Sequence, residues 1–333
     1  MKGLALALFL LAVAHAAAAQ IPPPSHEPPP GVVRVWGHAQ ARNLVRRWAA
    51  SFETAHPGVR IDARLTGSDI GFAGLYTGQA DIALVGREAT DSETKAFEWV
   101  FRYKPASVQV MTGSLDRAGR SPAIVVFVHR HNPLERLSLA QLAAIFGHGE
   151  GPLGAIRTWG QLGLTGTWAD APIRLYAPMA ESGTGRAFRA RVLGGSTKMN
   201  WDHLREFADE VSQPDGIDTS GARIAAALAS DRYGLALSNL GSARPELKPI
   251  ALASAGDGEY CHATRVNVID RRYPLARSIY AYVNQRPGVA LAPSVRLFLK
   301  HILSDHGQAV VSDYGYLRLN ARILAEQRRL VDR

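Results

Sequence analysis

The stretch that decides the fold is VVRVWGHAQARNLVRRWAASFETAHPGVRIDARL, residues 32–65. It opens on the β-rich run 32–36. The apolar residues of 39–55 then recur at positions i, i+4 and i+8, which is the spacing of an amphipathic helix. Residues 59–65 alternate apolar and polar side chains, as a half-buried strand does. The stretch therefore predicts a strand, a helix and a second strand.

The same alternation continues beyond this stretch. A short helix is predicted over 71–76, and DIALV at 81–85 predicts a third strand. A β-α-β-α-β order builds a parallel sheet with helices on both faces. Later strands are predicted at 124–128, 233–238 and 278–283, and later helices after Ser138 and over 223–229, 293–303 and 307–314. The chain is thus predicted to be α/β.

The N-terminal region reads as a secretion signal followed by a tether. Residues 1–19 contain Lys2, an apolar run and an Ala-x-Ala cleavage site, as a cleavable signal peptide does. Six of the ten residues 21–30 are proline, so 20–31 is expected to be an extended linker. These features predict a periplasmic protein whose folded body begins near residue 32.

Composition excludes several classes of protein. The formal net charge is +9, but the basic residues are scattered and no basic run is interleaved with aromatic residues, so no nucleic-acid partner is expected. The chain has one cysteine, Cys261, which rules out a disulfide within the chain and a site of several thiolates. A buried thiol is the expected role of Cys261.

Three junctions between a predicted strand and the helix after it carry residues suited to an anion. They are 36–39, 66–69 and 181–185, and each combines glycine with a hydroxyl or imidazole side chain. In open α/β sheets ligands bind at such junctions, where unpaired N–H groups stand at the positive end of a helix. For any one junction alone, an ordinary helix cap explains the same residues.

Two enzyme signals and one metal signal are weak. Ser182 could be a nucleophile, but Ala180 replaces the first glycine of G-x-S-x-G. Residues 149–154 match G-x-G-x-x-G in the wrong context, because they follow a helix and contain proline. His129 and His131 lack an identifiable third ligand. We therefore expect no catalysis, no cofactor and no metal, with a Ser182-dependent hydrolase as an alternative.

The order of these motifs resembles the periplasmic phosphate-binding proteins of ABC importers, the PstS-like group. No single motif is specific, but their order and spacing are similar over about residues 32–315. The matching segments are 67–71, 78–83, 137–139, 145–147, 158–159, 181–184 with Phe188, 233–236 and 273–275.

The resemblance implies a two-lobed periplasmic-binding-protein fold of type 2, each lobe a mostly parallel sheet flanked by helices, with a hinge between. Lobe 1 would comprise 32–122 plus 251–333, and lobe 2 would comprise 123–250. It further implies a monomer that captures phosphate or a related oxyanion and delivers it to an ABC permease in the inner membrane. A secreted anion sensor or scavenger without a permease is the alternative.

The resemblance also implies a set of ligand-binding residues in the cleft: His38, Ser68, Asp69, Arg87, Ser182, Gly183 and Thr184. The sequence departs from the family pattern at three places. His38 stands where the family carries Ser or Thr, and residues 86–88, Gly-Arg-Glu, stand where it carries Asp or Ser after the third strand. No arginine precedes the S-G-T loop, so Arg87 or Arg186 is expected to supply the positive charge. The identity of the anion stays open.

Overall fold

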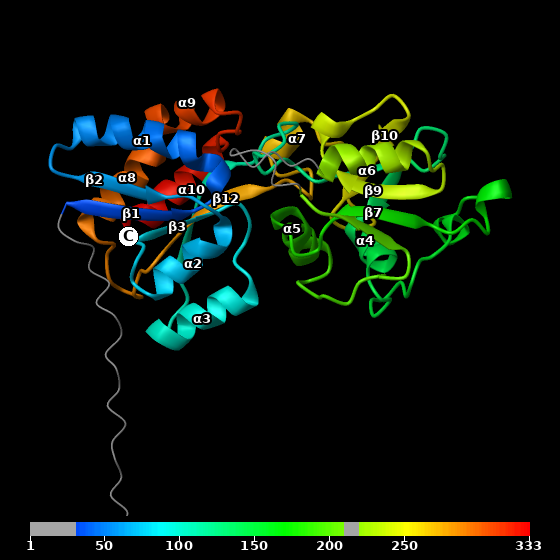
Figure 1. Cartoon of the computed structure of the whole chain (residues 1–333), viewed down its shortest axis with the longest axis horizontal. Helices are drawn as coiled ribbons and strands as arrows, with labels where there is room; N and C mark the ends of the chain where they lie inside the picture. The colour runs from blue at the N-terminus through cyan, green and yellow to red at the C-terminus, as the bar shows by residue number, and fades with distance from the viewer. Residues whose placement is uncertain (1–30, 210–219) are drawn as a thin grey trace, which may run out of the picture.

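The structure, a computed structural model, describes residues 31–209 and 220–333. It consists of two α/β lobes that lie side by side (Figure 1). The predicted signal peptide and all but the last residue of the predicted linker lie outside the described residues.

The first lobe is built on a five-stranded sheet in the order β2-β1-β3-β12-β4. β1 runs parallel to β2 and β3, as predicted, whereas β12 is antiparallel to both β3 and β4. The sheet is therefore mixed. Its strands are β1 (Val32–Gly37), β2 (Arg60–Arg64), β3 (Ile82–Val85), β4 (Ala106–Thr112) and β12 (Ser278–Val283).

Helices cover both faces of this sheet (Figure 1). On one face lie α1 (Arg42–Ala55), α8 (Pro293–Ile302), α9 (Asp305–Asp313) and α10 (Ala321–Asp332), and on the other lie α2 (Ser68–Tyr76) and α3 (Asp91–Phe101). Alternation along β3 explains this layering: Ile82 and Leu84 join the core under α1, and Ala83 and Val85 join the core under α2. A strand buried on both faces reads as the continuous apolar run seen in the sequence.

The second lobe has a five-stranded sheet in the order β10-β5-β9-β7-β8. β7 is parallel to β8 and β9, and β5 is antiparallel to β9 and β10. The elements are β5 (Val125–His129), β7 (Arg174–Pro178), β8 (Leu204–Phe207), β9 (Gly234–Ser238), β10 (Leu247–Pro249), α4 (Leu139–Phe146), α5 (Gly183–Val192), α6 (Ser220–Ala229) and α7 (Arg265–Ile269).

Two chain segments cross between the lobes, and they lie against each other. The N–H of Gly113 donates to the carbonyl of Arg277 at 2.9 Å, and the N–H of Ile124 donates to that of Leu275 at 3.1 Å. These paired segments form the hinge. The predicted first crossing, near residues 122–123, falls within the first of them.

For the return crossing we propose a later place than the predicted one at residue 251. Strand β11 (Ala251–Ala253) pairs with β6 (Arg136–Ser138), and Leu252, Tyr273 and Leu275 belong to the core of the second lobe. We therefore propose that the second lobe extends to about residue 275 and that the chain returns at 276–278. The division 32–122 plus 251–333 against 123–250 is otherwise kept as a prediction.

Within the part of the chain that the structure describes, no helix has the length and apolar character needed to span a membrane.

Candidate functional site

A cleft of about 450 Å³ lies between the two lobes. We call it the interlobe cleft. The first lobe and the hinge contribute His38, Ser68, Asp69, Gly86, Arg87, Ser121 and Arg277, and the second lobe contributes Glu181, Gly183, Thr184 and Arg186. Of the three junctions singled out from the sequence, two lie on the first lobe and the third lies on the second lobe. All three open on the interlobe cleft.

On the first lobe, the cleft is formed where parallel strands end. His38 directly follows β1, Ser68 is the first residue of α2, and Gly86 directly follows β3. Ser68 Oγ lies 3.5 Å from both His38 Nδ1 and the N–H of Gly86. A Cβ at Gly86 would come within 2.7 Å of Ser121 Oγ and 2.8 Å of His38 Cε1, so only glycine fits there. The backbone of Gly86 consequently lies close to the cleft.

His38 is a buried, neutral side chain. Burial, together with the charges of Arg277 and Arg120, lowers the pKa of His38 to about 3. Its Nε2 atom lies 3.3 Å from Ser121 Oγ and 3.4 Å from Tyr316 Oη. Near neutral pH the ring can therefore donate only one N–H, so His38 brings a hydrogen-bond donor to the cleft but no positive charge.

On the second lobe, the cleft is formed by the N-terminus of α5. Ser182 caps this helix by accepting the N–H of Gly185 at 3.0 Å, while Gly183 and Thr184 line the cleft. Ser182 itself does not line it. The first N–H groups of a helix lack intrahelical acceptors and carry the positive end of the helix dipole, so this end suits an anion.

Arg277 joins the two sides of the cleft. It is buried, lies in the return crossing, and donates to the carbonyl of Gly86 at 2.8 Å and to the carbonyl of Gly183 at 3.3 Å. It also donates to Thr184 Oγ1 at 3.0 Å. Sequence reasoning missed this residue. The only signal was its position between the family landmark 273–275 and the strand that begins at Ser278.

Arg87 is buried, and its charge is already matched. Both of its terminal nitrogens contact Glu93 at 2.7 Å, and Nη2 also lies 3.0 Å from Asp69. Burial favours the neutral form of Arg87, but these acidic partners outweigh burial and raise its pKa. Its role as counter-charge for a ligand stays a prediction, and the geometry favours Arg277 for that role.

Asp69 and Arg186 form a bridge between the lobes at the edge of the cleft. Arg186 Nη1 lies 2.7 Å from Asp69 Oδ1, and its Nε lies 3.2 Å from Glu181 Oε2. Glu181 also pairs with Arg189 at 2.9 Å. Two of the three carboxylates that line the cleft, Asp69 and Glu181, therefore have cationic partners, which reduces their repulsion of an anion; the third is Asp209.

The remaining predicted features can be placed. Cys261 is buried, and burial raises the pKa of its thiol. The rings of His129 and His131 lie 5.0 Å apart, and in residues 31–209 and 220–333 no group of three or more His, Cys, Asp or Glu residues could hold a metal. Ser182 Oγ has no hydrogen bond to a histidine among the described residues, so its position supports helix capping.

Comparisons with known proteins agree with this architecture. A family model described as a PBP superfamily domain matches residues 23–306. The phosphate-binding protein PstS of Pseudomonas aeruginosa is 31% identical over 283 residues, which cover 84% of this chain and 81% of that protein. The protein SphX of Synechococcus elongatus is 25% identical, covering 82% of this chain and 73% of its own length.

Among solved structures, the fold is similar to two receptors of low sequence identity. PstS from Borrelia burgdorferi has a TM-score of 0.60 at 15% identity and covers 87% of this chain and 99% of that one. An ABC-type phosphate transport receptor from Vibrio cholerae has a TM-score of 0.56 at 19% identity, with 86% and 99% covered. At these identities the likeness establishes the fold alone.

Proposed function

Because this chain belongs to the PBP superfamily, and to its PstS-like group, we propose that it is a periplasmic solute-binding protein that captures phosphate in the interlobe cleft. It delivers the anion to an ABC permease and carries out no catalysis. The relatives at 31% and 25% identity are not described as enzymes, and one is named for phosphate binding. The observation that carries the proposal is Arg277, whose buried guanidinium reaches both walls of the cleft.

Phosphate fits the donors that converge on this cleft. The N-termini of α2 and α5 both open on it, and Ser68, Thr184 and neutral His38 add side-chain donors. Hydrogen bonds to a charged group contribute about 1.5–3 kcal/mol each, so five to eight of them offset the cost of ordering and reach micromolar affinity, about 8 kcal/mol. Closure of the lobes removes water from the anion and strengthens each contact.

The direct test is calorimetric titration of the purified, ligand-stripped protein with phosphate, sulfate, molybdate and small carboxylates. We expect phosphate to bind with one site in the cleft. Heat from none of these anions would contradict the proposal. Binding of sulfate or molybdate alone would support an anion site in the cleft but would contradict phosphate as its ligand.

The Ser68→Asp variant tests the place of binding. Ser68 is the first residue of α2, where an acidic side chain is favourable to the helix, so the variant is expected to fold. Its carboxylate would stand in the cleft and repel the anion. Two unit charges 4 Å apart interact by about 4 kcal/mol near a protein surface, so we expect phosphate affinity to fall at least about a hundredfold.

The matched control is Ser304→Asp. Ser304 caps α9 by accepting the N–H of Gly307, and it lies outside the cleft. Aspartate also caps helices well, so this variant places the same charge at a helix start without a nearby ligand. Equal phosphate affinity in the two variants would contradict the cleft as the binding site.

The permease partner is tested by uptake. In a bacterial strain that lacks this gene, the wild-type chain should restore uptake of labelled phosphate, and Ser68→Asp should not. Tight phosphate binding without restored uptake would favour the alternative, a scavenger or sensor.

A further inference from the structure

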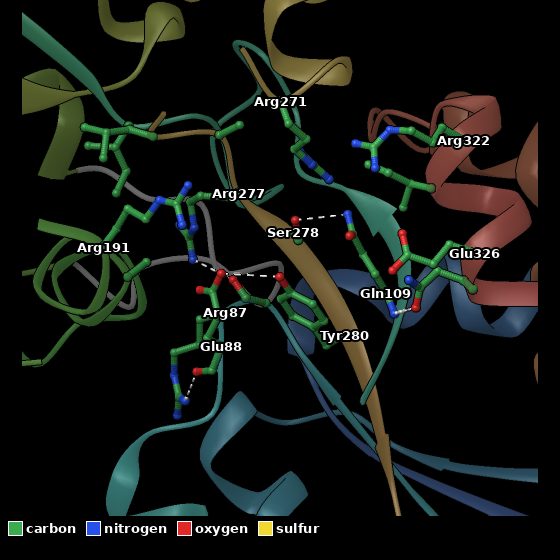
Figure 2. Close-up of a pocket in the computed structure, with 17 residues that line it drawn as sticks. Arg87, Glu88, Gln109, Arg191, Arg271, Arg277, Ser278, Tyr280, Arg322 and Glu326 are labelled. Carbon is green, nitrogen blue, oxygen red and sulfur yellow. Dashed lines mark hydrogen bonds between the residues drawn. The ribbon is translucent and has the colours of Figure 1, made fainter. Parts of the chain in front are cut away.

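A second cavity lies behind the hinge, on the far side of Arg277 from the interlobe cleft. Its volume is about 310 Å³, and we call it the hinge cavity. Gly86, Arg87 and Arg277 form the wall that it shares with the cleft. The rest of its polar lining is Glu88, Gln109, Arg191, Arg271, Ser278, Tyr280, Arg322, Glu326 and Gln327 (Figure 2).

Arginine dominates this lining. Five arginines face two glutamates, Glu88 and Glu326. Of the five, Arg87 is paired with Glu93 and Asp69, and Arg277 donates to groups of the interlobe cleft. The other three are Arg191 of α5, Arg271 just after α7 and Arg322 of α10. In Figure 2, Arg271 and Arg322 reach toward each other, and Arg191 approaches from the opposite side of the β12 segment.

These three arginines are not held in ion pairs among the described residues. Arg271 donates to the carbonyl of Val268 at 3.2 Å and to Thr112 Oγ1 at 2.9 Å. Arg191 donates to the carbonyl of Pro274 at 3.2 Å. No ion pair joins any of the three to a carboxylate of residues 31–209 or 220–333. Burial lowers the pKa of Arg271 and outweighs the opposite effects of the nearby Tyr280 and Glu88.

The other polar groups of the lining are hydrogen-bonded to one another. Gln109 Nε2 donates to Ser278 Oγ at 3.1 Å, and Tyr280 Oη donates to Glu88 Oε1 at 3.3 Å. Both hydroxyl groups therefore lie on the cavity wall beside the arginine forks. Guanidinium forks match the planar geometry of carboxylate and phosphate oxygens. Without the paired Arg87, four arginines stand against Glu88 and Glu326, so the lining has a net charge of 4 − 2 = +2 and favours a ligand with more than one negative charge.

We propose that the hinge cavity binds a small oxyanion with two or more negative charges, such as a diphosphate or a tricarboxylate. The ligand contacts α5 of the second lobe through Arg191 and α10 of the first lobe through Arg322. It therefore bridges the lobes at the hinge. This site is separate from the phosphate site of the interlobe cleft and goes beyond the function proposed above.

The experiment titrates pyrophosphate and citrate into the ligand-stripped protein in which Ser68→Asp blocks the interlobe cleft. We expect at least one of the two to bind, and Arg271→Gln or Arg322→Gln to weaken that binding about tenfold or more. Pyrophosphate alone would identify a phosphate-based ligand, and citrate alone a carboxylate-based one. The matched control is Arg318→Gln, since Arg318 is exposed and lies outside the cavity.

The Arg322→Gln variant keeps the experiment decisive if Arg271→Gln disturbs folding, because Arg322 is exposed and has no hydrogen bond to the described residues. The proposal is overturned if neither anion binds, or if binding is equal in Arg322→Gln and Arg318→Gln. Neither result depends on whether the cleft of the wild-type protein binds phosphate. A failure of this proposal can therefore be distinguished from a failure of the proposed function.

Discussion

At the scale of single residues, the site depends on one long side chain that crosses between the lobes. Arg277 donates to Gly86 on one side and to Gly183 and Thr184 on the other. Its position is fixed by the hinge, where its carbonyl accepts the N–H of Gly113. The family pattern places an arginine before the S-G-T loop, and we propose that here Arg277, about 90 positions later in the chain, supplies that charge.

Replacing Arg277 should weaken phosphate binding. Arg277→Ala removes a buried charge and three hydrogen bonds, so we expect affinity to fall at least about tenfold, and calorimetric titration measures it. Arg277→Lys keeps the positive charge and loses the forked guanidinium, so its phosphate affinity should lie between those of the wild type and of Arg277→Ala. The exposed Arg318→Ala serves as control. An unchanged affinity in Arg277→Ala would remove Arg277 from the site.

His38 should make stability depend on pH in the acid range. Its pKa of about 3 in the folded chain lies below the value of about 6.5 expected when unfolded, so between these values the unfolded chain binds more protons. Stability therefore falls as the pH drops from about 6.5 towards 3. In thermal unfolding, His38→Gln should lose less stability over this pH range than the wild type does. The exposed His131→Gln should behave like wild type, and a parallel loss in His38→Gln would contradict the assignment.

At the scale of elements, helix starts determine both folding and function. α2 and α5 begin at the cleft, whereas α4 begins away from it with a complete capping box. Ser138 accepts the N–H of Gln141 at 3.2 Å, and Gln141 Oε1 accepts the N–H of Ser138 at 2.9 Å. The same residue types thus serve a structural role in one helix and line a ligand site in another.

Removing the cap of α4 should affect stability without affecting binding. Ser138→Ala deletes the side-chain acceptor of this buried helix start, so we expect unfolding to cost about 1 kcal/mol less. Denaturant unfolding measures the change, with the exposed Ser230→Ala as control. Phosphate affinity should stay at the wild-type value. A large loss of affinity would indicate that α4 contributes to the cleft.

At the scale of the whole molecule, ligand binding should stabilise both lobes together. The cleft takes residues from each lobe, and the paired crossing segments connect them. A ligand that binds only the folded state adds about 2.7 kcal/mol at a hundredfold excess over Kd. We therefore expect phosphate to raise the unfolding temperature by several degrees in scanning calorimetry. An equal rise in Ser68→Asp would contradict binding in the cleft.

The sequence by itself determined the α/β class, most of the elements, and the three junctions that meet at the cleft. These depend on side-chain periodicity and on cap residues, which act within a few positions of the chain. The pattern missed α3, β4, β8 and α10, and it did not reveal that β12 runs antiparallel to its neighbours.

Only the tertiary structure decided what reaches the cleft. In the folded chain Arg277 and Ser121 line the cleft, Ser182 caps α5, and Arg87 pairs with Glu93. The tertiary structure also gathered Arg191, Arg271 and Arg322 around one cavity. These groups are far apart in sequence, and their meeting depends on how two lobes pack across a hinge. Because no local pattern encodes a contact over such separations, the chain had to fold before either site could be recognised.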